Sequence, residues 1–233
     1  DDAFNRMVDI KNVTSALRRE GRAEGVLYAF AAAPGESALD GEGDNSPFTS
    51  ALLKYFDTPG QEVMTAMKLV QQEVYDMTRG LQLPYIVSGS ASMFYPNTAE
   101  GELDEREKLL LSMANLTPQD RGLVERIARR NDDMPLAPLY ASLLTRGLTT
   151  LEDKERELEE VVSQYTKYRN MLAQLRADIP EVQELLAEAK DLMRLGAVKE
   201  ATAILSRAFE VNQLDSSITD ATDRRHLTGA QIL

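Results

Sequence analysis

The apolar run from Val26 to Ala33 constrains the fold of this chain more than any other feature, because it stops abruptly at Pro34-Gly35. A short, nearly continuous apolar run bounded by turn residues is typical of a strand that is buried on both faces of a sheet. Residues 36–46 then form an acidic, glycine-rich segment. Ligands of open α/β sheets bind beyond the carboxyl ends of such strands, so this loop is the predicted functional site.

Helical and strand patterns alternate through the first part of the chain, which is an α/β plan. Ser46 is suited to cap a helix that has Pro47 at its first position. In the next predicted helix the apolar side chains recur on one face and indicate core rather than a methionine-rich metal site. They are Val63, Met67, Val70, Val74 and Met77. The predicted helices cover residues 10–20, 47–56 and 60–79, and the predicted strands cover 26–33 and 85–90.

The rest of the chain is predicted to be helical, which gives three regions: an α/β half domain at 1–99, a helical linker region at 100–148, and a long helix with a helical region at 149–233. Residues 100–108 are predicted to be a charged linker. Thr117 and Thr150 are predicted helix caps. From Thr150 a helix is expected to reach residue 177, with an apolar seam at the spacing of a coiled coil or long hairpin. The seam is Leu158, Val161, Tyr165, Tyr168, Leu172 and Leu175, and Asp178-Ile179-Pro180 is expected to end this helix and cap the next.

The first region resembles the small-subunit half of the caspase and metacaspase superfamily of cysteine endopeptidases. Two motifs carry the resemblance in the same order and with a matching gap, and together they cover roughly the first 97 residues. They are Tyr28-Ala29-Phe30 with Ala33-Pro34-Gly35 and Phe48, and then residues Leu81 to Ser88 with Phe94-Tyr95. The resemblance implies a caspase-like half domain that belongs to a hydrolase.

The catalytic pair of that family is absent from this chain. Caspases use a Cys nucleophile with a His about 50 residues upstream of it. The chain has no Cys, and its one His, His226, lies far from the matching region. The N-terminal segment, Asp1 to Arg6, resembles the segment directly after the catalytic Cys in the family. We therefore expect no catalytic residue here, no protease activity of the chain alone, and a large-subunit partner portion that carries the Cys and the His.

The loop after Pro34-Gly35 departs from caspases in a way that predicts its specificity. Caspases carry an aromatic residue and then an Arg, which binds an acidic substrate side chain, where this chain has Leu39 and Asp40. Metacaspases have a Ser-Ala-Asp whose Asp accepts a basic side chain, and Ser37-Ala38-Leu39-Asp40 resembles that version with one residue inserted. A carboxylate binds a guanidinium in two parallel hydrogen bonds. The resemblance thus implies an acidic S1 pocket at Asp40 that favours Arg, then Lys, before the scissile bond.

The other substrate-binding candidates form the wall of the groove from Ala38 to Asp44, namely Ala38, Leu39, Glu42 and Asp44. Acidic residues also occur in such loops because Asp adopts turn geometry readily, and this explanation is favoured for Glu42 and Asp44. We expect no cofactor and no metal. The alternative is a calcium site built from Asp40, Glu42 and Asp44, which lacks the rest of the EF-hand pattern.

A second resemblance concerns the C-terminal helices. Residues Leu185 to Leu192, followed by Gly196, Ala201, Leu205 and Ala208, look like one tetratricopeptide helix hairpin. Such repeats usually occur in arrays, and their concave faces bind partners. The resemblance implies an extension that binds a regulatory protein, and the array is expected to continue beyond Leu233. A plain helical extension packed on the protease domain is the alternative.

Composition excludes several other functions. A net charge of −12 argues against direct nucleic-acid binding, which requires a basic face. No apolar run is long enough to form a membrane-spanning helix, so a membrane is not among the predicted partners. The absence of Cys fits a reducing, cytoplasmic location and, with the compact loop, favours a bacterial protein. Two alternatives to a peptidase stay open. One is a non-catalytic scaffold with the protease fold. The other is a helical interaction protein whose first hundred or so residues match by accident, which would be established if Ala29 to Ala33 were not a central strand.

Overall fold

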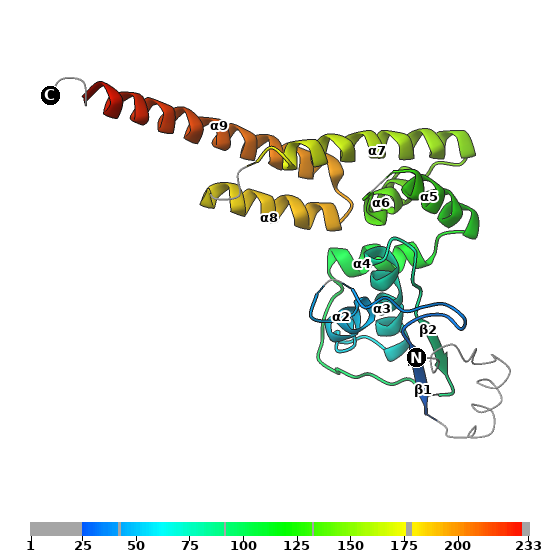
Figure 1. Ribbon diagram of the computed structural model, residues 1–233. Helices are drawn as coiled ribbons and strands as arrows, with labels where there is room; N and C mark the ends of the chain where they lie inside the picture. The colour runs from blue at the N-terminus through cyan, green and yellow to red at the C-terminus, as the bar shows by residue number, and fades with distance from the viewer. Residues whose placement is uncertain (1–24, 42, 91, 132, 176–178, 230–233) are drawn as a thin grey trace, which may run out of the picture. The chain divides into compact units, whose positions relative to one another are not determined.

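The computed structural model describes residues 25–41, 43–90, 92–131, 133–175 and 179–229, and it describes 214–229 by backbone alone. The helix expected at 10–20 and the cap residue Asp178 lie outside the described residues, and so does Glu42. The chain divides into two compact units, Asp1–Glu125 and Arg126–Leu233. Both strands of the described residues belong to the first unit, and the described part of the second unit is helical (Figure 1). The regions predicted at 1–99, 100–148 and 149–233 stay predictions.

The first unit contains a two-stranded antiparallel sheet, made of β1 (Leu27–Phe30) and β2 (Tyr85–Ser88). Tyr28 pairs with Val87, and the rings of Phe30 and Tyr85 lie 6.2 Å apart. The prediction that β1 is buried on both faces is wrong, since Phe30 is 37% exposed. Two features fit this exposure: β2 is the one strand paired with β1 among the described residues, and Phe30 is the last residue of β1.

Helices α2 (Pro47–Tyr55) and α3 (Val63–Met77) form where helices are predicted, and α4 (Glu105–Ala114) comes after β2. Helix α2 packs on α3, and α3 packs on α4. Ser46 caps α2 by accepting a hydrogen bond from the Thr49 N–H at 3.3 Å, as predicted. Val70 and Val74 of α3 are fully buried, whereas Met77 is 50% exposed, so the predicted stripe holds for four of its five members. Each buried aliphatic side chain of this kind stabilises the fold by about 1.5–3 kcal/mol.

The predicted charged linker at 100–108 is only partly correct, because α4 begins inside it at Glu105. Asp104 caps the helix: it accepts a hydrogen bond from the Glu107 N–H at 2.7 Å, while the Glu107 carboxylate accepts one from the Asp104 N–H at 2.8 Å. Arg106 is buried at 7% exposure. The segment is therefore a structural part of the first unit. Helix α5 (Pro118–Arg130) crosses the division between the units.

The second unit consists of helices among the described residues: α6 (Leu136–Arg146), α7 (Leu151–Leu172), α8 (Pro180–Arg194) and α9 (Val198–Gly229). Helix α9 packs on both α7 and α8. Thr150 caps α7 through the Asp153 N–H at 3.1 Å, as predicted. Helix α7 is shorter than expected because the backbone tightens after Leu172, where the Leu175 N–H donates to the Leu172 carbonyl. This turn brings Leu175 against the apolar cluster between α8 and α9.

Gly196 turns the chain between α8 and α9 with a positive φ of 80°. Ala189, Ala201, Leu205 and Ala208 are fully buried, so a helix hairpin is present where one was expected. Its assignment as a tetratricopeptide hairpin stays a prediction. Within the part of the chain that the structure describes, no helix combines the length and hydropathy needed to cross a membrane.

Candidate functional site

The loop between β1 and α2 is closed by a turn at its start. The Glu36 N–H donates to the Ala33 carbonyl at 2.9 Å, and Gly35 has a positive φ of 88° that suits a residue without a side chain. Gly41 adopts a φ of 79°, and a Cβ there would lie 3.2 Å from the Pro47 ring. The loop therefore lies closely against the first turn of α2.

Gln82 lies in the turn that leads from α3 to β2, and its side chain bonds to the main chain of this loop at two places, Ala31 and Leu39. Its Nε2 donates to the Ala31 carbonyl at 2.7 Å, and its Oε1 accepts from the Leu39 N–H at 2.9 Å. The Gln82 side chain is completely buried. Thr78 holds the Gln82 main chain, because its hydroxyl accepts from the Gln82 N–H at 3.1 Å.

A hollow of about 580 Å³ lies between this loop, the start of α2 and the end of α3. Leu39 lines it and is 38% exposed. Among the described lining residues Arg79 is the charged one, so the lining is mainly neutral. The full lining consists of Leu39, Gly41, Gly43, Asn45, Pro47, Ser50, Met77, Thr78, Arg79 and Leu81.

The predicted substrate-binding residues are not gathered into one acidic pocket. Leu39 lines the hollow, whereas Ala38, Asp40 and Asp44 are exposed and lie outside its lining. Glu42 lies outside the described residues. Their roles in substrate binding stay predictions. Among the residues that the structure describes, no group of three His, Cys, Asp or Glu side chains is placed to hold a metal ion.

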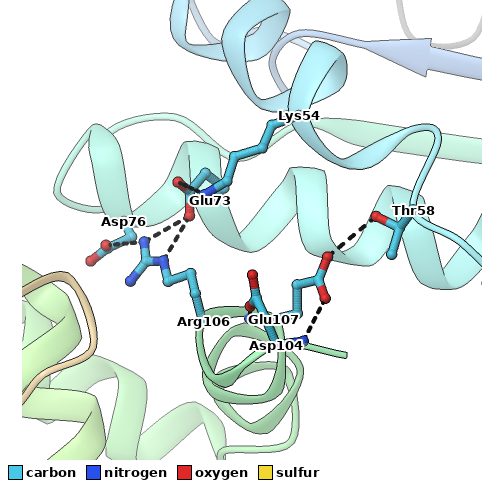
Figure 2. A network of polar contacts seen from close by, with 7 residues as sticks. All are labelled: Lys54, Thr58, Glu73, Asp76, Asp104, Arg106 and Glu107. Carbon is cyan, nitrogen blue, oxygen red and sulfur yellow. Dashed lines mark hydrogen bonds and ion pairs between the residues drawn. The ribbon is translucent and has the colours of Figure 1, made fainter. Parts of the chain in front are cut away.

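A second polar arrangement in the first unit is buried (Figure 2). Arg106 of α4 donates to Glu73 at 2.7 and 3.0 Å and to Asp76 at 2.6 Å, both on α3. Lys54 of α2 reaches Glu73 at 3.5 Å. The three helices are thus joined by charges that lie largely away from solvent. Such pairs balance a high cost of desolvation rather than add much net stability.

The same environment affects two titratable groups. Burial lowers the pKa of the Arg106 guanidinium, but the charges of Asp76 and Glu73 outweigh this and raise the pKa above its ordinary value. Burial, followed by the charge of Glu73, raises the pKa of the Tyr55 phenol above its ordinary value. The Tyr55 hydroxyl has no hydrogen-bond partner among the described residues. Both groups therefore keep their usual protonation state at neutral pH.

Sequence reasoning missed Gln82 and Arg106. Gln82 lies within the second caspase-like motif, directly after Gly80 and Leu81. An amide between two leucines and next to a glycine turn was the available signal, because a buried amide needs partners. Glu73 and Asp76 lie one helical turn apart on α3, but their partner, Arg106, is distant in sequence.

One protein-family model matches part of the chain. A family model described as "Caspase domain" matches residues 7–95, which is less than half of the 233 residues. This range includes both strands, the loop after β1, α2, α3 and Gln82. The match supports a caspase-like cysteine peptidase family for this part of the chain. It also argues against an accidental resemblance, although β1 is not seen as a central strand in the described residues. No curated protein and no solved structure matches the chain significantly.

Proposed function

We propose that the first part of this chain is the small-subunit portion of a caspase-like endopeptidase that cleaves after Arg and, less well, after Lys. The caspase-domain match over residues 7–95 carries the proposal. The chain has no Cys, so the nucleophile comes from a partner portion that also supplies the His. The Cys thiolate attacks the scissile carbonyl carbon, the amine leaves with a proton from the His, and water hydrolyses the thioester.

This chain contributes the substrate groove in the proposed enzyme. Asp40 directly follows Leu39, whose side chain lines the hollow. A substrate Arg would place its apolar stem against such a surface and its guanidinium on the Asp40 carboxylate. The exposed position of Asp40 fits a carboxylate that becomes enclosed when the substrate and the partner portion bind.

The test is the exchange of Asp40 for Asn in the assembled protein, meaning this chain together with the proposed large-subunit portion. Loss of the charged partner of a guanidinium that the substrate complex buries should lower kcat/KM for Arg peptides by several kcal/mol of transition-state binding, at least about 100-fold. Glu36→Gln, in the same exposed loop, is the matched control and should leave kcat/KM unchanged. Equal cleavage after Arg by Asp40→Asn and Glu36→Gln would contradict the assignment of Asp40.

The helical extension is proposed to bind a regulatory protein that controls the peptidase. The α8–α9 hairpin supports this, because buried small residues let its helices approach as in repeat proteins that bind partners. A non-catalytic scaffold is the competing function. The assembled protein distinguishes them, since a scaffold would lack the Cys or the His in the partner portion and would cleave no peptide.

A further inference from the structure

Gln82 has a geometry that goes beyond filling space in the core. Its side chain is completely buried, and both of its polar ends bind main-chain atoms that are distant in sequence. Nε2 meets the Ala31 carbonyl 51 residues away, and Oε1 meets the Leu39 N–H 43 residues away. One amide therefore fixes both ends of the loop segment 32–38.

The main chain of Gln82 is itself held in place. Thr78, at the end of α3, donates to the Val74 carbonyl at 2.7 Å and accepts from the Gln82 N–H at 3.1 Å. Arg79 and Gly80 both have positive φ, which turns the chain sharply between these residues. Helix α3 thus supplies a rigid base from which the Gln82 side chain reaches the loop.

The hydrogen bond to Leu39 controls the part of the loop that faces the hollow. Leu39 lines the hollow, and Asp40 is the next residue. Without this half-buried bond the Leu39 N–H would lose its partner, and the backbone at Asp40 would gain freedom, because glycines with positive φ at positions 35 and 41 flank the segment. The proposed substrate-binding position therefore depends on a residue that does not itself face the substrate.

We propose that Gln82 is a positioning residue that holds the Ala31–Leu39 loop in its binding conformation and thereby sets the affinity for the basic substrate residue. The inference rests on the proposed function for its effect on substrate, but the holding of the loop can be measured separately. Gln82 acts on binding through Leu39 and does not take part in bond cleavage, so KM should change more than kcat.

The experiment uses three variants of the assembled protein. Gln82→Met keeps the length and shape of the side chain but removes both hydrogen bonds. Gln71→Met is the matched control, since Gln71 Nε2 donates to the Pro84 carbonyl at 2.7 Å and its Oε1 accepts from Lys68 at 2.8 Å, so its hydrogen bonds among the described residues go to partners outside the loop. Gln82→Glu can accept a hydrogen bond from the Leu39 N–H in either protonation state, but it can donate to the Ala31 carbonyl only when its carboxyl group is protonated. Burial raises the pKa of such a carboxyl group, so protonation occurs at a mildly acid pH.

Two measurements are made on each variant: hydrogen exchange of the Leu39 amide, and KM and kcat for an Arg peptide. Gln82→Met should speed Leu39 exchange and raise KM on the order of tenfold with kcat nearly unchanged, as expected for two lost hydrogen bonds. Gln71→Met should change neither. At the same pH the Leu39 amide should exchange more slowly in Gln82→Glu than in Gln82→Met, because the Glu side chain still accepts its hydrogen bond. The KM of Gln82→Glu should approach that of the unmodified protein at the same pH as the pH is lowered, whereas that of Gln82→Met should not, which separates positioning from general loss of structure.

Unchanged Leu39 exchange in Gln82→Met would overturn the inference, whatever the activity. Faster exchange with an unchanged KM would also overturn it, because Gln82 would then hold the loop without affecting substrate. If the unmodified protein cleaves no peptide, the proposed function fails and the substrate effect fails with it, while Leu39 exchange still decides whether Gln82 holds the loop. Unfolding of Gln82→Met would shift the decision to the pH dependence of Gln82→Glu.

Discussion

Replacing Arg106 with Met tests the buried charge network most sharply. The Arg106 side chain is 8% exposed, and its partners Glu73 and Asp76 are 5% and 12% exposed. Met retains most of the apolar volume but leaves two carboxylates without their main cation. Removing one member of a buried ion pair typically costs about 3–5 kcal/mol. Lys54 still reaches Glu73 at 3.5 Å, so we expect about 3 kcal/mol of destabilisation.

Urea unfolding followed by far-ultraviolet circular dichroism measures this loss, with the m-value compared between proteins. Arg156→Met is the matched control, because Arg156 also pairs with an acid, Asp153 of its own helix, but its side chain is 77% exposed. Exposed pairs of this kind contribute little, so the control should unfold like the unmodified protein. Adding Glu73→Gln to Arg106→Met should recover part of the loss, since one uncompensated charge is then removed. Equal stabilities of Arg106→Met and Arg156→Met would refute the reasoning.

Two further substitutions test the packing of the two units. Tyr55→Phe should be neutral or stabilise by up to about 1 kcal/mol, because its buried hydroxyl makes no hydrogen bond with the described residues. The pKa of Tyr55 is raised above its unfolded value of about 10. The free energy of unfolding is therefore unaffected by this phenol below that pH and falls as the pH rises, because the unfolded chain then loses the proton more readily than the folded one. Urea titrations at increasing alkaline pH should therefore show a smaller loss for Tyr55→Phe, and an identical loss would be inconsistent with the burial of this phenol. Gly196→Ala should destabilise by at least about 2 kcal/mol, because the new Cβ would lie 2.4 Å from the Ala141 Cβ. Gly147→Ala has a similar φ of 57° but no atom within 4 Å of the new Cβ, so it should lower the free energy of unfolding by only about 1 kcal/mol. Thermal unfolding of both variants measures the difference, and equal losses would exclude the close approach at Gly196.

Local chemistry explains the structural features that could be predicted from sequence. Ser46, Thr117 and Thr150 each cap a helix as expected, because the cap and its backbone partner lie only three residues apart. Pro47 and Pro180 begin their helices for the same local reason. The two caspase-like motifs were also readable, and the family match covers both of them.

Long-range contacts explain the failures. An apolar run predicts burial but does not show what covers it, so the exposure of Phe30 could not be foreseen. Met77 follows the period of the α3 stripe, yet it lies at the last turn, where the hollow replaces a packing partner. Arg106 was assigned to a linker because charged residues surround it, whereas its buried partners lie 33 and 30 residues earlier. The role of Gln82 could not be predicted either, because its partners Ala31 and Leu39 lie 51 and 43 residues away in the sequence.

The most direct test of the central proposal is a set of fluorogenic peptides that differ only in the residue before the scissile bond: Arg, Lys, Asp or Ala. The peptides are offered to the assembled protein, meaning this chain together with the proposed large-subunit portion. We predict cleavage confined to Arg and Lys peptides, with Arg preferred. Preference for Asp would keep the caspase-like class but contradict the acidic pocket at Asp40, and it would favour a cation such as Arg79 at the hollow. Silence towards all four peptides would contradict the peptidase and favour the scaffold.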